Sequence, residues 1–210
     1  MPVPKRRTST TKRNKRRAHD ALRQASEYVA EGRSMVVDLD LEKFFDRVNH
    51  DLLMTRLGNK VKDKRLLRLI KQYLRAGFVD NQFYGESREG VPQGGPLSPL
   101  LANIYLHYAL DDWFAKVVKR DCQGEAYLVR YADDFVVQCR SQEEAQAALA
   151  IIQEWVEALE LRLHPTKTRI VDATQRGGFD FLGYHFERGM RWPRKKSLAK
   201  LKARLRAKTS

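Results

Sequence analysis

Cysteine is scarce in this sequence, and long hydrophobic runs are missing. The two cysteines, Cys122 and Cys139, cannot form a disulfide framework, so they indicate a reducing compartment. No stretch of about 18 apolar residues is present, which argues against a membrane-spanning helix. The basic first residues have no apolar stretch behind them, so we expect no secretory signal. These absences together predict a cytoplasmic protein without a membrane partner.

Acidic residues are absent from both ends of the sequence. Residues 1–17 hold eight Lys and Arg residues and residues 191–210 hold nine, so residues 18–190 carry 23 basic and all 26 acidic residues. The net charge of +14 therefore comes from the two ends. Basic segments attract polyanions, most often nucleic acid, although a solubilising tail is the alternative. The candidate contacts are Lys12, Arg13, Lys15, Arg16, Arg17, Arg194, Lys195 and Lys196.

The composition between these ends is that of a folded domain. The chain is 42% hydrophobic, which is enough for a sizeable core. We expect residues 1–17 to be a disordered arm, residues 18–190 to form one domain, and residues 191–210 to add a basic helix. Apolar strands at 126–131 and 135–140 are joined by a tight turn, and this hairpin favours an α+β fold with a mixed or antiparallel sheet.

Local signals predict further elements around that hairpin. Residues 18–31 have helical spacing, residues 34–41 form an apolar strand, and residues 98–118 read as one long helix. Ser141 and Glu144 have the spacing of a capping box, which predicts that a helix begins there.

Two pairs of carboxylates interrupt apolar segments. Asp133 and Asp134 occupy the tight turn, where repulsion and burial penalise both charges unless a cation binds. Asp38 and Asp40 end the strand at 34–41, and carboxylates from neighbouring strand ends can converge on hard cations. Two cations about 4 Å apart would support nucleotidyl transfer. For each pair, a solvated turn or strand end is the alternative.

Glycine and proline dominate residues 90–99, immediately before the expected long helix. The segment reads Gly-Val-Pro-Gln-Gly-Gly-Pro-Leu-Ser-Pro. Glycine lets a backbone approach a ligand closely, and a helix N-terminus favours a phosphate. The alternative is an elaborate entry to the helix.

Four segments match, in order, the motifs of one known family. They are residues 40–50 (Asp-Leu-Glu-Lys-Phe-Phe-Asp-Arg-Val-Asn-His), residues 90–105, residues 131–134 (Tyr-Ala-Asp-Asp), and residues 163–168 (Leu-His-Pro-Thr-Lys-Thr) with residues 181–184 (Phe-Leu-Gly-Tyr). Over about residues 18–205 the chain resembles the palm of a bacterial reverse transcriptase of the group II intron (retron-like) type. The resemblance implies truncated fingers and thumb regions.

The resemblance also implies a catalytic centre. Asp40, Asp133 and Asp134, with the main-chain carbonyl of Leu41, would bind two Mg²⁺ ions, for which Mn²⁺ can substitute. Lys167 would be a fourth catalytic residue, near the triphosphate, where it could protonate or neutralise the leaving pyrophosphate.

Substrate contacts follow from the same resemblance. Phe45 occupies the position of a steric gate that favours dNTPs over ribonucleotides. The nucleotide and template contacts would be Phe45, Pro92, Gln93, Gly94, Gly95 and Tyr131. The primer grip would be Phe181, Leu182, Gly183 and Tyr184.

The expected function is RNA-directed DNA polymerisation, in which the 3′-hydroxyl of a primer attacks a dNTP. Its partners would be an RNA template, a DNA or RNA primer and dNTPs, with intron RNA or a second chain supplying fingers as further candidates. Two alternatives remain: a non-catalytic, maturase-like RNA-binding fragment, and one half of a split reverse transcriptase.

Overall fold

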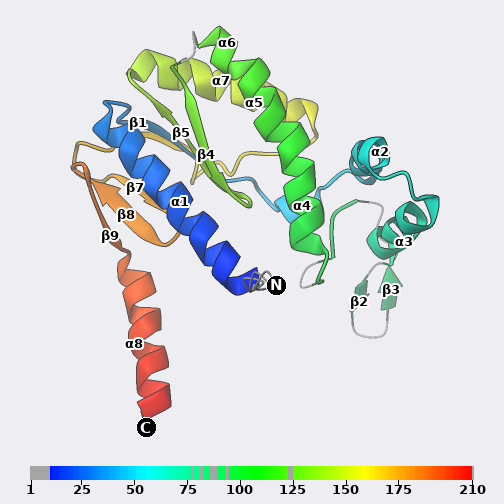
Figure 1. Ribbon diagram of the computed structural model, residues 1–210. Helices are drawn as coiled ribbons and strands as arrows, with labels where there is room; N and C mark the ends of the chain where they lie inside the picture. Colours follow the sequence, from blue (N-terminus) through cyan, green and yellow to red (C-terminus); the bar gives the residue numbers. More distant parts are fainter. Residues whose placement is uncertain are drawn as a thin grey trace, which may run out of the picture.

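An antiparallel sheet forms the centre of the chain. The structure is a computed structural model that describes residues 10–76, 78–80, 83–85, 89–92, 95–122 and 125–209. The strand order is β4-β5-β1-β6, from β1 (Met35–Leu39), β4 (Tyr127–Tyr131), β5 (Asp134–Cys139) and β6 (Arg169–Asp172) (Figure 1). Because Leu39 pairs with Phe135, the end of β1 meets the turn between β4 and β5. The predicted hairpin and α+β fold are confirmed.

Strand β5 is covered on both faces, and residues 135–139 are all buried. Helix α7 (Gln142–Ala158) packs on one face and α1 (Thr10–Ala30) on the other (Figure 1). Val137 therefore belongs to the cluster that contains Ile152 of α7, whereas Val136 belongs to the cluster that contains Ala25 of α1. A strand buried on both faces requires a continuous apolar run, which is the pattern seen in the sequence.

The predicted capping box at the start of α7 is confirmed. The Ser141 hydroxyl accepts a hydrogen bond from the Glu144 backbone N–H at 3.2 Å, and the Glu144 carboxylate accepts one from the Ser141 N–H at 3.3 Å. Two donors that the helix leaves without partners are satisfied in this way. The capping box thus fixes the start of α7 shortly after β5 ends at Cys139.

Helix α1 begins at Thr10, eight residues earlier than the sequence led us to expect. Residues 10–17 are helical rather than disordered, and residues 1–9 lie outside the described residues. This stretch is basic but contains no Gly or Pro, and Lys and Arg have high helix propensity. Low apolar content was therefore a poor guide to disorder here, because the helix continues from a segment anchored on the sheet.

The expected long helix at 98–118 is interrupted. It consists of α4 (Ser98–Leu106), a π-helical turn η2 (His107–Asp111), α5 (Asp112–Lys116) and α6 (Val118–Asp121). A π-helical turn is wider than an α-helical one, and such turns are frequent at functional sites. Residues after the π-helical turn are therefore rotated relative to those before it.

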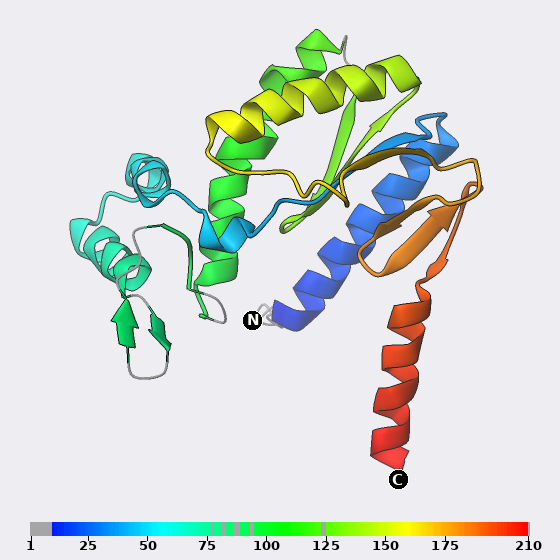
Figure 2. The same ribbon diagram turned by 180° about the vertical axis from the view of Figure 1, so that it is seen from behind.

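The remaining elements lie at two sides of the central sheet (Figure 2). They are α2 (His50–Lys60), α3 (Lys64–Arg75), a hairpin of β2 (Phe78–Asp80) and β3 (Phe83–Gly85), a sheet of β7 (Phe179–Phe181), β8 (Tyr184–Glu187) and β9 (Met190–Pro193), and α8 (Lys195–Thr209). Residues 191–193, expected in the basic helix, belong to β9. Helix α8 extends away from the body (Figures 1 and 2). Of the helices described, none is long and apolar enough to cross a bilayer.

Both cysteines are buried and free, which leads to a first prediction. Burial raises the pKa of the Cys139 thiol to about 12, so the reactive thiolate is almost absent at pH 8. In a Cys122→Ser variant, we expect the remaining thiol of Cys139 to react with Ellman's reagent only as the protein unfolds in urea. Rapid labelling of the native protein would contradict the burial of Cys139.

Candidate active site

The turn between β4 and β5 carries the predicted pair of carboxylates. Tyr131 pairs with Asp134, so Ala132 and Asp133 form a two-residue hairpin turn. Ala132 has a left-handed backbone with φ of 58°, which costs a residue other than glycine about 1 kcal/mol. A positive φ at this place matches the twist of the flanking strands. A small strain is therefore accepted in a turn that places two adjacent carboxylates at one end of the sheet.

Asp40, Asp133 and Asp134 lie in one electrostatic neighbourhood. Asp40 follows the last residue pair of β1 with β5, and Asp134 precedes it on the other strand. Burial raises the pKa of Asp134, and the negative charges of Asp133 and Asp40 raise it further, while a hydrogen bond from Leu182 and the charge of Arg194 lower it. The antiparallel pairing thus brings together carboxylates that are far apart in the sequence.

Backbone pairing between two chain segments brings Lys167 beside Asp40. The segment before it is joined to the end of β1, because the N–H of His164 donates to the carbonyl of Asp40 at 2.7 Å and Leu41 forms a bridge with Leu163. The Lys167 ammonium then lies 2.8 Å from Oδ2 of Asp40. All four residues predicted as catalytic are therefore contributed by three chain segments that meet at one end of the sheet.

The carboxylates fit a divalent cation by their chemistry. Carboxylate oxygens suit hard cations, and the mutual repulsion that raises the pKa of Asp134 is what a cation would relieve. The ammonium of Lys167 already neutralises Asp40. Among the described side chains, however, no group of three His, Cys, Asp or Glu residues is arranged to hold a metal. The metal roles of Asp40, Leu41, Asp133 and Asp134 stay predictions.

The predicted primer grip lies directly against this turn. Leu182 and Gly183 form the turn between β7 and β8, with φ of 49° and 82°. The backbone N–H of Leu182 donates to Oδ2 of Asp134 at 3.2 Å. Phe181 is buried, while Tyr184, its partner across the hairpin, is partly exposed. The structure brings these residues to the carboxylates, although their contact with a primer stays a prediction.

The segment after β1 holds the start of the predicted template loop. Phe45 lies in a short 3-10 helix, η1 (Phe44–Asp46), and its carbonyl accepts a hydrogen bond from the N–H of Val91 at 2.6 Å. Gly90 has φ of 85°, and a Cβ there would lie 2.9 Å from the carbonyl oxygen of Asp46. Glycine is therefore required for this close approach. Backbone contacts thus hold Phe45 and the start of the loop together.

The far end of the same loop is fixed to α4 and α3. The Ser98 hydroxyl donates to the carbonyl of Pro92 and is 2.9 Å from the hydroxyl of Tyr73. A Cβ at Gly95 would lie 1.8 Å from that Tyr73 oxygen, so the loop passes very close to α3. Gln93 and Gly94 lie outside the described residues.

The basic residues predicted to contact nucleic acid lie on α1, on α8 and immediately before α8. Those with exposed side chains are Lys15, Arg16, Arg17, Lys195 and Lys196. Arg194 instead forms an ion pair with Asp180, with 3.2 Å between Nη1 and Oδ2. The side chains of Lys12 and Arg13 are outside what the structure describes. A cavity of about 400 Å³ between α1 and α4 is lined by Arg17, Asn103 and Tyr131, which places Tyr131 beside α1.

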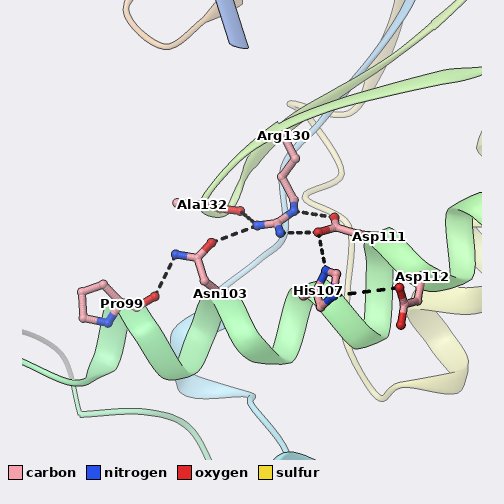
Figure 3. Close-up of polar contacts among 7 residues, drawn as sticks. All are labelled: Pro99, Asn103, His107, Asp111, Asp112, Arg130 and Ala132. Carbon is pink, nitrogen blue, oxygen red and sulfur yellow. Dashed lines mark hydrogen bonds and ion pairs between the residues drawn. The ribbon is translucent and has the colours of Figure 1, made fainter. Parts of the chain in front are cut away.

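Two charged residues near the site, Asp38 and Arg130, are not among the predicted site residues. Asp38 forms an ion pair with Arg169 at 3.5 Å, and burial raises its pKa to about 6 despite that partner. Arg130 pairs with Asp111, as Figure 3 shows. The signal in each case was a charge within an apolar strand, which requires a partner when the strand is buried. Sequence alone could not identify that partner.

Comparisons with known proteins identify the family of this chain. The model of the family described as reverse transcriptase (RNA-dependent DNA polymerase) matches residues 5–186. Protein YkfC of Escherichia coli K12 is 32% identical over 183 residues, which is 73% of this chain and 47% of YkfC. The group II intron-encoded protein LtrA of Lactococcus lactis is 40% identical over 95 residues, which is 45% of this chain and 16% of LtrA. The match thus spans about half, or less, of each curated relative.

Solved structures show the same fold at low sequence identity. Telomerase from Candida albicans, in complex with a fragment of telomeric RNA, gives a TM-score of 0.62 at 15% identity and covers 83% of this chain and 34% of that one. Apo telomerase from Candida tropicalis, truncated from its C-terminal domain, gives 0.61 at 13% identity and covers 90% of this chain and 40% of that one. Together with the family match over most of its length, these likenesses show that the chain belongs to the reverse transcriptase family.

Proposed function

We propose that this chain is an RNA-directed DNA polymerase of the group II intron type. The observation that carries the proposal is the meeting of Asp40, Asp133, Asp134 and Lys167 at one end of the sheet. Their segments are separated in the sequence, and they meet because β1 pairs with β5 while Asp40 and Leu41, which follow β1, pair with the stretch before Lys167. The substrates would be an RNA template, an annealed primer and dNTPs.

The chain's own residues divide the work of nucleotidyl transfer. Reverse transcriptases use divalent metal ions, and in our proposal two Mg²⁺ ions would activate the primer 3′-hydroxyl and stabilise the leaving oxygen. Asp40, Asp133 and Asp134 would hold these ions. Lys167 would leave Asp40 and neutralise or protonate the departing pyrophosphate. The protein would supply alignment and charge rather than a covalent intermediate.

Primer extension on an RNA template tests the proposal. The assay would use an annealed DNA primer, dNTPs and Mg²⁺ or Mn²⁺, with the parent protein and the double variant Asp133→Asn/Asp134→Asn. We expect the parent to extend the primer and the variant to show no extension while it keeps its fold and its RNA affinity. Extension by both proteins would overturn the proposed roles of the two carboxylates.

The same assay separates the polymerase from an RNA-binding fragment. The exposed basic side chains of α1 and α8 are the observation that favours RNA binding, which would weaken steeply with salt. If neither protein extends the primer and both bind RNA equally, this chain by itself is an RNA-binding module. A split enzyme would then be tested by restoring extension with a second chain.

A further inference from the structure

Arg130 lies at the edge of the candidate site with little exposure to water. It is the residue before Tyr131 near the end of β4, and its side chain is 12% exposed. A guanidinium so far removed from solvent must be paired and hydrogen-bonded, because an isolated charge would be strongly destabilising there. Figure 3 shows that its partners come from the turn between β4 and β5 and from the helical segment formed by α4 and η2.

The guanidinium donates four hydrogen bonds in two directions. Nε and Nη2 form a two-pronged pair with the carboxylate of Asp111, at 2.7 and 2.5 Å. Nη1 donates to Oδ1 of Asn103 at 3.0 Å and to the backbone carbonyl of Ala132 at 2.7 Å. Only a planar fork of fixed geometry can reach all three acceptors at once, so lysine could not replace arginine here.

These acceptors belong to elements with different predicted roles. Ala132 is the left-handed residue of the turn that carries Asp133 and Asp134. Asn103 lies on α4, and its Nδ2 donates to the carbonyl of Pro99 at 2.8 Å, at the start of the helix that follows the predicted template loop (Figure 3). One side chain therefore links the turn between β4 and β5 to α4, the helix that follows the predicted template loop.

The π-helical turn η2 contributes the strongest partner. Asp111 is the last residue of this turn, and the wider spacing of the turn changes the direction of Asp111 relative to Asn103. Both side chains point towards Arg130 in Figure 3, and Nδ1 of His107 lies 3.3 Å from Oδ2 of Asp111, the oxygen that also accepts from Nη2 of Arg130. The interruption of the helix thus has a structural consequence at the site.

We propose that Arg130 is a positioning residue, which holds the Ala132 carbonyl and thereby fixes the two carboxylates of the turn relative to α4. The inference rests on the proposed function and adds to it a link between the turn that carries Asp133 and Asp134 and α4, the helix that follows the predicted template loop. The left-handed φ of Ala132 carries a small energetic cost, and the hydrogen bond from Arg130 to the Ala132 carbonyl helps to hold the turn in this conformation.

The test compares Arg130→Gln and Arg130→Lys with a matched control, Arg120→Gln. Arg120 forms an exposed ion pair with its neighbour Asp121 on α6. Mn²⁺ affinity would be measured from the electron paramagnetic resonance signal of the free ion, without nucleotides. We expect both Arg130 variants to bind Mn²⁺ roughly tenfold more weakly, as is typical when a group that orients metal ligands is removed. The control should bind as the parent does.

Enzyme kinetics give the second readout. The Mg²⁺ concentration for half-maximal extension should rise and kcat should fall in both Arg130 variants, while affinity for the primer–template stays unchanged. A folded Arg130→Gln protein with parental Mn²⁺ affinity and Mg²⁺ midpoint would overturn the inference. If that variant does not fold, Arg130→Lys, which keeps the charge, gives the same decision, and so does Asp111→Asn.

The two proposals fail in different ways. If the parent binds Mn²⁺ but never extends a primer, and Arg130 substitution weakens its Mn²⁺ affinity, the proposed polymerase activity is overturned and the positioning role is retained. A parent that extends primers and is unaffected by Arg130 substitution would do the reverse. A parent that neither binds Mn²⁺ nor extends a primer would overturn both.

Discussion

Asp40→Asn is expected to reduce primer extension roughly 1,000-fold, because the loss of one metal-binding charge removes several kcal/mol of transition-state stabilisation, at about 1.36 kcal/mol per factor of ten. Its fold should survive. The carboxylate is 43% exposed and its pair with Lys167 is open to solvent, so this contact contributes about 1 kcal/mol or less to stability. Steady-state extension at saturating dNTP, with thermal unfolding in parallel, measures both quantities.

Asp38→Asn is the matched control for that experiment. Asp38 lies two residues earlier and is only 20% exposed, but its carboxylate pairs with Arg169 rather than with Lys167. We expect this variant to extend primers at a rate within about tenfold of the parent, since its carboxylate is not among the metal ligands we propose. Equal losses in the two variants would show that general negative charge at the end of β1, and not the position of Asp40, sustains the reaction.

Gly178→Ala should destabilise the protein by about 3 kcal/mol or more, the upper range for forcing atoms into a packed region. A Cβ at this position would lie 1.7 Å from the carbonyl oxygen of Phe186 and 2.8 Å from its carbonyl carbon. These are backbone atoms of β8, so they can move only if the hairpin of the predicted primer grip opens. The free energy of unfolding in urea measures the loss.

Gly177→Ala provides the comparison for Gly178→Ala. Gly177 has φ of 97°, so alanine is strained there too, but a Cβ would meet nothing within 4 Å. We expect it to cost about 1–2 kcal/mol, the penalty of a left-handed backbone alone. If both substitutions cost the same, backbone strain rather than the contact with β8 controls the stability of this hairpin.

Local signals in the sequence were sufficient for several elements. The apolar run of β5 and the capping box at Ser141 and Glu144 depend on neighbouring residues alone, and both are confirmed. The meeting of Asp40 with Asp134 depends on the pairing of two distant strands, which no local pattern contains. The residues alone indicated that strand-end carboxylates can converge, and resemblance to a family indicated which of them meet; the register of β1 with β5 supplies the physical reason.

Other features could not be predicted because they follow from tertiary contacts. All residues of β9 (Met190–Pro193) are exposed, so the strand has no alternation of buried and exposed positions and its pairing with β8 is what defines it. No pattern in the sequence predicts the π-helical turn at His107–Asp111. Its Asp111 meets Arg130, a partner from another element, and Arg130 could as well have contacted nucleic acid.

The central position of β1 has a consequence for how the protein folds. β1 lies between β5 and β6, so neither of its edges finds a partner until much of the chain has been synthesised. Contacts between residues so distant in sequence slow folding, because the loop between them must close first. Until then, the apolar Val36 and Val37 are available to wrong partners. Production on the ribosome should therefore expose an aggregation-prone intermediate, and slower translation before β5 would prolong it.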